Sequence, residues 1–199
     1  MKATFALLAN REVHNCVRRL SWEIHRQYHT SISICRLPPH ISLKQPFRIP
    51  DMAALASYMD ELADSIAPFE VKLTELELIP TTIEGIETGL LWLDVQETEH
   101  LRQLHERVNQ EVGQRFKNTQ AAFDGASYHF HMTVAMGGQP LDVYRKLYSE
   151  LSNRRVNLQY TVNELAMFVY DEPLSSTGDY MTYKIAPVGG QRAPNQDAG

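Results

Sequence analysis

The sequence has few of the features that mark disulfide-rich, membrane or disordered proteins. Its two cysteines, Cys16 and Cys35, form no CxxC pair and no framework, so reduced thiols in the cytoplasm are expected. No apolar run approaches the roughly 20 residues of a membrane span, so no membrane partner is expected. Glycine and proline number ten each in 199 residues, which excludes collagen-like and low-complexity classes. A soluble globular chain is the class that remains.

Basic residues are fewer than acidic ones, and the net charge of −5 argues against DNA as a partner. The two kinds of charge are unevenly distributed along the chain. Residues 1–50 hold eight Lys and Arg against two Asp and Glu, whereas residues 51–112 hold three against fourteen. The basic first segment could steer an anionic substrate, but a solvated surface often shows the same asymmetry. Charge alone leaves both interpretations open.

Apolar periodicity predicts alternating strands and helices in a single domain over residues 1–189. Strands are expected at 4–8, 40–43, 69–79, 90–95, 129–135, 158–169 and 180–185. Helices are expected at 12–28, 51–66, 101–112 and 140–151. Pro80 should end the third strand, Gly137 and Gly138 should form a turn, and Pro140 should take a first helical position. Residues 190–199 are expected to be a disordered tail.

The predicted order repeats. Residues 3–80 and 89–188 both follow the pattern strand, helix, strand, helix, strand, which makes the fold class α+β with an internal duplication. The best-matching positions of the two halves are His40-Ile41-Ser42-Leu43 and His131-Met132-Thr133-Val134. Because residues i and i+2 share one face of a strand, each segment should direct one imidazole and one hydroxyl to the same side. The two pairs could then meet across a cleft.

Two histidines and two hydroxyls suffice to cleave a phosphodiester without a metal. Histidine has an unperturbed pKa of about 6.5, so one ring can act as a base while the other acts as an acid. The hydroxyls of Ser42 and Thr133 would donate hydrogen bonds to the phosphoryl oxygens and stabilise the growing charge. The competing interpretation is that His40 and His131 are ordinary core or surface residues.

The paired motifs, read from Pro39 to Lys44 and from His131 to Ala135, resemble those of the 2H phosphoesterase superfamily, also called the LigT-like or 2′-5′ RNA ligase family. The resemblance covers about residues 3–188. It implies a bilobal α+β fold with antiparallel sheets lining a central cleft and helices outside. It also implies metal- and cofactor-independent cleavage of 2′,3′-cyclic phosphates or 2′-5′ linkages in RNA ends or small nucleotides. By position, His40 would be the proton donor, His131 the proton acceptor, and Ser42 and Thr133 the phosphate-binding residues.

Other residues are weaker candidates. Lys44 could hold a phosphate or be a solvated strand-end lysine. Tyr128, Phe130 and Tyr170 could stack on nucleobases, although aromatic residues in this pattern commonly belong to a core. His129 and His131 form an H-x-H pair, but no third ligand is evident in the sequence, so no metal site is expected.

Three alternatives stay open at this point. A non-catalytic protein of the same fold could hold a nucleotide or RNA end without turning it over. Other branches of the family act on cyclic oligonucleotide signals, which widens the substrate class. An ATP-dependent transferase would need a phosphate-cradling loop, and the sequence contains no Walker A or G-x-G-x-x-G motif. A monomer that binds a nucleotide or an RNA terminus with a cyclic phosphate is the expected state.

Overall fold

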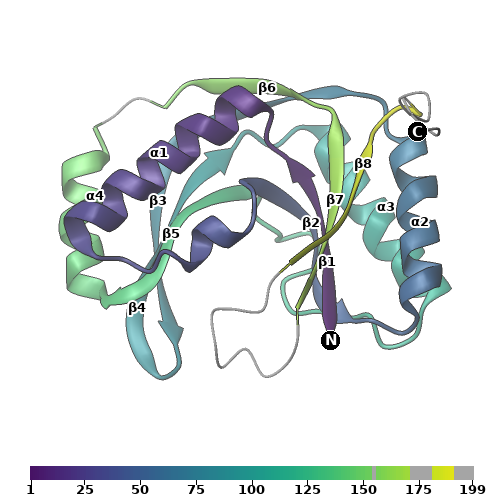
Figure 1. Cartoon of the computed structure of the whole chain (residues 1–199), viewed down its shortest axis with the longest axis horizontal. Coiled ribbons are helices and arrows are strands. Elements are labelled where there is room, and N and C mark those ends of the chain that lie inside the picture. The colour runs from purple at the N-terminus through teal and green to yellow at the C-terminus, as the bar shows by residue number, and fades with distance from the viewer. Residues whose placement is uncertain (154–155, 171–180, 191–199) are drawn as a thin grey trace, which may run out of the picture.

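Two antiparallel four-stranded sheets form the frame of the molecule (Figure 1). The computed structural model describes residues 1–153, 156–170 and 181–190. The strands are β1 (Lys2–Leu8), β2 (His40–Arg48), β3 (Phe69–Ile83), β4 (Ile86–Val95), β5 (His131–Pro140), β6 (Leu158–Val162), β7 (Glu164–Tyr170) and β8 (Met181–Pro187). The helices are α1 (Arg11–Tyr28), a 3₁₀ turn η1 (Ser33–Arg36), α2 (Met52–Ser65), α3 (Glu99–Arg115) and α4 (Leu141–Leu151).

The order of elements confirms the predicted repeat, yet the two halves of the sequence do not form one sheet each. The first sheet has the order β2-β1-β7-β8 and the second has the order β5-β4-β3-β6. Strand β3 of the first half therefore pairs with β4 of the second, and β7 of the second half pairs with β1 of the first. The first half thus donates β3 to the sheet of the second motif, and the second half donates β7 and β8 to the sheet of the first.

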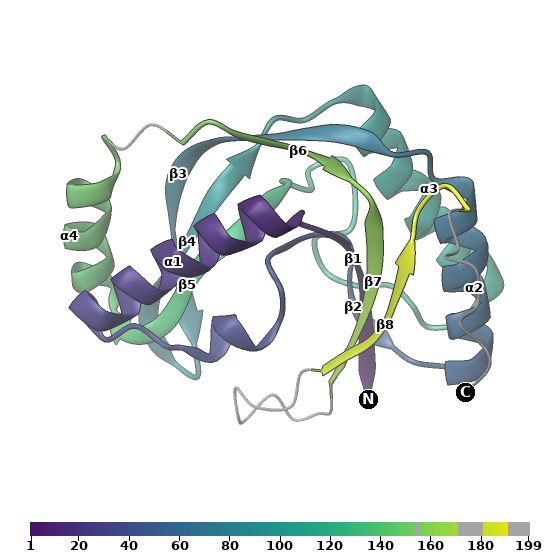
Figure 2. The ribbon, with the colours of Figure 1, turned by 45° about the horizontal axis from the view of Figure 1, so that its top comes forward.

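Helices cover the outer face of each sheet. Figures 1 and 2 show α2 and α3 beside the first sheet and α1 and α4 beside the second. Helix α1 packs against β5 and α4 against β3 and β4, whereas α2 contacts β7 and β8 and α3 contacts β2. The expected α+β architecture with helices outside is confirmed. No helix among the described residues has the length and apolarity to cross a membrane.

Local signals set the helix starts. The side chains of Asn10, Asp51 and Thr98 each accept a hydrogen bond from the backbone N–H three residues later, which satisfies one of the free donors of the first turn. Asp51 is thus the N-cap residue of α2, and the helix expected from residue 51 begins at Met52. Pro140 differs from expectation, because it is the extended N-cap residue of α4 and the helix begins at Leu141. It supplies no side-chain cap.

Strand β3 also differs from expectation, since it continues through Pro80 to Ile83. Beyond Leu73, β3 pairs with β4 but no longer with β6, so one of its edges is open there. A proline is tolerated at an open edge because its missing N–H breaks no pairing on that side. The predicted strand 158–169 is in fact two strands, β6 and β7, which belong to different sheets and are separated by Asn163.

Gly137 and Gly138 lie within β5 instead of forming a separate turn. Both have positive φ, at 65° and 78°. A Cβ on Gly138 would overlap the backbone of Ser31, whose N–H donates to the Gly137 carbonyl at 3.1 Å. Glycine is therefore required here for the segment after α1 to pass close to β5. Of the predicted tail 190–199, residues 191–199 lie outside the described residues.

Candidate active site

The first motif begins strand β2, and its side chains alternate as the sequence predicts. Ile41 and Leu43 are fully buried in the main core, whereas His40 and Ser42 are half-buried on the opposite face. In the pairing with β1, His40 lies beside Leu8 and Ser42 beside Ala6. The apolar residues thus fix the strand, and the strand fixes the shared direction of the imidazole and the hydroxyl.

The second motif begins strand β5 with the same pattern. Met132 and Val134 are fully buried, whereas His131 and Thr133 are half-buried on the other face. In the pairing with β4, His131 lies beside Asp94 and Thr133 beside Trp92. Strands β2 and β5 contact each other although they belong to different sheets. The two motifs therefore come from the two strands that meet at the centre of the molecule (Figure 1).

Both histidines are held by an equivalent backbone hydrogen bond. His40 Nδ1 lies 2.8 Å from the carbonyl oxygen of Pro38, and His131 Nδ1 lies 2.8 Å from that of His129. A carbonyl oxygen can only accept, so each Nδ1 carries a proton and donates it. The Nε2 atom of each ring is then the one left for acid–base chemistry. Sequence reasoning missed these two hydrogen bonds. The signal was present, because each acceptor carbonyl belongs to the residue two positions before its histidine.

Burial gives His40 an unusual pKa. Loss of hydration disfavours the imidazolium and lowers the pKa of His40 to about 4, against a weaker opposing effect of the Pro38 hydrogen bond. The positive charges of His131 and Arg18 lower it further. Arg18 is held nearby, where its guanidinium donates to the backbone carbonyls of Ile34 and Leu37. The ring of His40 is therefore neutral at pH 7 and lies within electrostatic reach of His131.

His131 has a lowered pKa for the same main reason, which is desolvation by burial. The hydrogen bond to the His129 carbonyl and the Asp94 carboxylate both favour its charged form, whereas a cationic His129 ring disfavours it. Both rings of the pair therefore hold a proton less readily than a free imidazole does.

Aromatic rings support each catalytic candidate, and sequence reasoning missed them. The indole of Trp92 stacks on the ring of His131 at a centroid distance of 4.2 Å, and on that of His129 at 5.3 Å. Phe168 of β7 meets the ring of His40 edge-on at 4.7 Å. Trp92 lies on β4, which pairs with β5, and Phe168 lies on β7, two strands from β2 in the first sheet. Only the pairing of the strands therefore brings these rings to the motifs.

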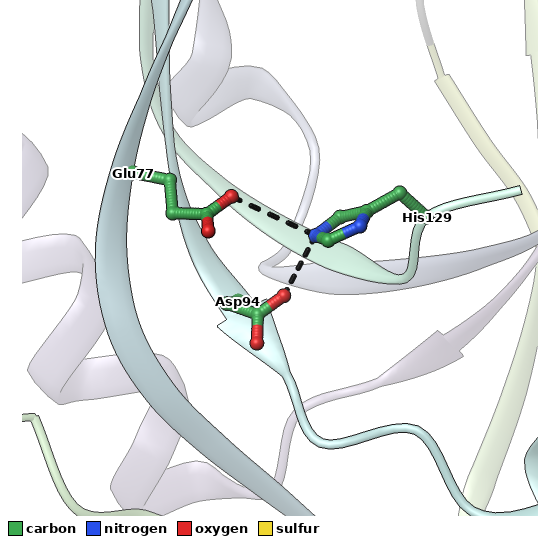
Figure 3. Close-up of side chains that lie close together, drawn as sticks. All are labelled: Glu77, Asp94 and His129. Carbon is green, nitrogen blue, oxygen red and sulfur yellow. Dashed lines mark ion pairs between the residues drawn. The ribbon is translucent and has the colours of Figure 1, made fainter.

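Two carboxylates join His129 beside the second motif. His129 Nε2 lies 2.7 Å from Asp94 Oδ1 and 3.7 Å from Glu77 Oε2 (Figure 3). The three ligand-type atoms lie within 4.8 Å of one another, and this is the one such group among residues 1–153, 156–170 and 181–190. The distance to Asp94 is that of a direct hydrogen bond, which a protonated Nε2 can donate without an ion. The expectation of no metal stays a prediction.

Lys44 is buried and forms an ion pair. Its side chain is buried, and the ammonium group pairs with the Asp124 carboxylate, which also accepts from the backbone N–H of Gln45. It is therefore no solvated strand-end lysine, and its charge is already compensated by a structural partner. Phosphate binding by Lys44 stays a prediction that its burial does not support. The partner was invisible in the sequence because it lies 80 residues away.

The three predicted stacking residues are buried. Tyr128 packs face to face on His105 at 4.5 Å, and its hydroxyl donates to the Ser42 carbonyl at 3.1 Å. Phe130 has only 1% of its surface exposed, and Tyr170 has 3%. The structure gives these rings a packing role, and Tyr128 also ties the two motif regions together. Stacking on a nucleobase by these rings stays a prediction without structural support.

Comparison with known proteins identifies a family. The family model of the 2′-5′ RNA ligase superfamily matches residues 11–173. No curated protein sequence matches the chain.

Solved structures with the same fold span nearly the whole chain. The crystal structure of TT0787 of Thermus thermophilus is 17% identical, covers 96% of this chain and 100% of its own, and superposes with a TM-score of 0.63. LigT of E. coli complexed with 3′-AMP is 15% identical, covers 94% and 97%, and has a TM-score of 0.55. Usb1 of Kluyveromyces marxianus is 16% identical, covers 94% and 97%, and has a TM-score of 0.54. At these identities the likeness establishes the fold.

Proposed function

Since the chain belongs to the 2′-5′ RNA ligase superfamily of 2H phosphoesterases, we propose that it is a phosphodiesterase that opens 2′,3′-cyclic phosphates in RNA ends or nucleotides. The observation that carries the proposal is the equivalence of His40 and His131. Each begins a strand, donates Nδ1–H to the carbonyl two residues before it, and precedes a hydroxyl by two residues. Cytoplasmic location and a monomeric state belong to the proposal and rest on the sequence.

The proposed reaction needs no group beyond the protein and water. His131 Nε2 accepts a proton from the attacking water, whose oxygen forms a bond to phosphorus. The bond from phosphorus to one ribose oxygen breaks, and His40 Nε2 donates a proton to that leaving oxygen, which yields a phosphate monoester. The hydroxyls of Ser42 and Thr133 donate to the non-bridging oxygens, where negative charge grows in the transition state.

The lowered pKa of His40 supports its role in one respect and constrains it in another. With a pKa of about 4, a protonated His40 gives up its proton readily to a leaving oxygen. The reactive arrangement, with the proton on His40, is nevertheless the minor one in the free protein. A bound phosphate anion next to both rings would raise both pKa values and thereby favour the protonated forms.

Relatives of the same fold support a nucleotide ligand. LigT of E. coli has been crystallised with 3′-AMP and also with ATP, at TM-scores of 0.55 and 0.53 to this chain. The proposal extends binding of a nucleotide phosphate to the space between the motifs of β2 and β5. Hydrolysis of 2′-5′ linkages or of cyclic oligonucleotides uses the same groups and differs only in the ester attacked.

The test is turnover of a panel of cyclic mononucleotides, RNA with a 2′,3′-cyclic phosphate end, 2′-5′ oligoadenylate and cyclic oligonucleotides. We expect hydrolysis of at least one cyclic phosphate by the wild type and none by the His40→Ala/His131→Ala double variant. Tight binding of a panel member without turnover would instead identify a non-catalytic nucleotide-binding protein on the same fold.

A further inference from the structure

The first motif ends in a β-bulge. Ser42 of β2 pairs with Ala6 of β1, and Lys44 pairs with Phe5, so two successive residues of β1 lie opposite three residues of β2. Leu43 is the extra residue of β2 in this pairing. A bulge breaks the alternation of a strand and redirects its side chains, and bulges are frequent beside active sites. Here the bulge turns Lys44 to the face of Phe5, which lies in the core, whereas Ser42 stays on the opposite face.

The second motif ends in the same irregularity. Thr133 of β5 pairs with Trp92 of β4, and Ala135 pairs with Leu91, so Val134 is the extra residue of β5. Each bulge therefore follows directly after the hydroxyl residue of its motif. The first five residues of β2 and of β5 also share one burial pattern, in which the first and third are half-buried and the second, fourth and fifth are buried. The two motifs thus have a bulge in common as well as a histidine and a hydroxyl.

A helix side chain supports each bulge. Ser21 Oγ of α1 donates to the Val134 carbonyl at 2.8 Å. His105 Nδ1 of α3 lies 2.9 Å from the Leu43 carbonyl, which can only accept, and Asn109 Nδ2 lies 3.3 Å from the same oxygen. Ser21 and His105 are buried, so water does not compete for either hydrogen bond. A bulge leaves its extra residue without a regular partner, and a buried carbonyl in that position needs such a donor.

We propose that Ser21 and His105 are positioning residues for the two phosphate-binding hydroxyls. Ser21 holds the bulge that aims the Thr133 hydroxyl at the phosphate, and His105 holds the bulge that aims the Ser42 hydroxyl. The inference rests on the proposed function and adds to it two residues outside both motifs. Helix α1 belongs to the first half of the chain and supports the second motif, whereas α3 belongs to the second half and supports the first. Each half thus positions the phosphate donor of the other.

The proposed role predicts a loss in kcat more than in KM. A hydroxyl stabilises the transition state only when it points at the oxygen on which charge develops. The extra residue of each bulge is bonded directly to the hydroxyl residue, so loss of its support shifts the backbone from which the hydroxyl extends. A misplacement of about 1 Å can cost about 100-fold in rate. Because charge on the phosphoryl oxygens grows in the transition state, the bound substrate loses less than the transition state does.

The experiment is a double-mutant cycle between Ser21→Ala and Thr133→Val, measured as kcat for a 2′,3′-cyclic mononucleotide. We expect Ser21→Ala alone to lower kcat by about 10- to 100-fold with little change in KM. In the Thr133→Val background, which lacks the hydroxyl, Ser21→Ala should lower kcat no further. In the Ser42→Ala background it should still act by the full factor. His105→Phe, which keeps a ring against Tyr128, should show the reverse pattern.

The matched control is Thr88→Val. Thr88 is buried on β4, and its hydroxyl donates at 2.6 Å to the carbonyl of Gln139, at the opposite end of β5 from the second motif. The variant removes a buried hydroxyl-to-carbonyl bond from the same strand without touching either bulge, so kcat should stay near the wild-type value. A loss of kcat in Thr88→Val as large as that in Ser21→Ala would assign the effect to general weakening of β5 and overturn the inference.

A spectroscopic measurement separates the inference from the proposed function. Thr133 pairs with Trp92, so the NMR shift of the Thr133 γ-methyl group reports its orientation relative to the indole ring. Ser21→Ala should move this methyl resonance, whereas His105→Phe should leave it in place. An unmoved resonance in Ser21→Ala, or additive losses in the double-mutant cycle, would overturn the positioning role. Absence of all turnover in the wild type would overturn the proposed function, and the methyl resonance would still decide whether Ser21 orients Thr133.

Discussion

The indole of Trp92 lies stacked on the imidazole of His131, with ring centroids 4.2 Å apart and planes inclined by 22°. The indole is itself fixed, because its Nε1–H donates to Glu77 Oε2 at 3.0 Å. The negative face of an aromatic ring attracts a cation, so this contact favours the protonated form of His131 and holds the ring in one orientation. Trp92 is thus a positioning residue for the proposed base.

Replacing Trp92 with Leu should lower the pKa of His131 further, because the cation loses its aromatic partner. We expect kcat/KM to fall by about 2- to 30-fold, the range of a cation–π contact. An NMR titration of the His131 ring measures the pKa directly, and Trp92→Phe should recover part of the shift. An unchanged His131 pKa in Trp92→Leu would assign Trp92 a role in packing alone.

Each of the variants His40→Ala and His131→Ala should lower the rate by about two to four orders of magnitude, the usual contribution of a positioned acid or base. A substrate with an aryl leaving group should rescue His40→Ala, because that leaving oxygen needs no proton, and should not rescue His131→Ala. Rescue of His131→Ala alone would reverse the two roles. His100→Ala, outside both motifs, is the matched control, and near-normal rates in both motif variants would make the motifs structural.

The pH dependence of kcat/KM should be a bell on the acid side of 6.5. Activity requires one proton on the histidine pair, and burial lowers the pKa of both rings, that of His40 to about 4. The rate should therefore fall below about pH 4, where both rings are charged, and also as the pH rises towards the ordinary histidine pKa of about 6.5, by which point both rings are neutral. The two apparent pKa values of this profile belong to the coupled pair of histidines. The profile therefore does not show which histidine is the acid and which is the base. A maximum above pH 8 would contradict the lowered values.

Activity should survive exhaustive chelation, because the acid, the base and the phosphate donors are all protein groups. His129→Gln should have little effect, since its backbone carbonyl still accepts from His131 Nδ1. Complete loss of activity with EDTA, restored by zinc or manganese and abolished in His129→Gln, would instead make the group of Glu77, Asp94 and His129 a metal site.

Acid should destabilise the fold through His40. Its pKa is about 4 in the folded protein and about 6.5 when unfolded, so between these values the unfolded chain binds more protons. The stability that His40 contributes is complete above about pH 6.5 and is lost as the pH falls towards 4, by about 3 kcal/mol. Urea unfolding across this range should show a shallower decline for His40→Asn, whose amide still donates to Pro38. If the free energy of unfolding fell equally steeply with pH in the wild type and in His40→Asn, the lowered pKa of His40 would be refuted.

Local periodicity was enough to predict the order of the elements and the direction of the motif side chains. The alternation in His40-Ile41-Ser42-Leu43 is a property of one strand, and the structure confirms it. Contacts between strands were not predictable in the same way. The pairing of Lys44 with Asp124, which lies between α3 and β5, and the stacking of Trp92 on His131 depend on which segments become neighbours in the fold. A single sequence does not encode such contacts at any fixed spacing.

The exchange of strands between the halves has a consequence for biosynthesis. Strand β1 leaves the ribosome before α1, β2 and every element up to β6, and its partner β7 follows only after them, so one edge of β1 stays open while these elements are synthesised. Such long-range pairing is slow and exposes apolar surface until it is complete. The first motif is therefore synthesised well before the ring that packs against its histidine. That ring is Phe168, and it follows only with β7. A nascent chain that already carries both motifs would lack the assembled site while it is still close to messenger and ribosomal RNA.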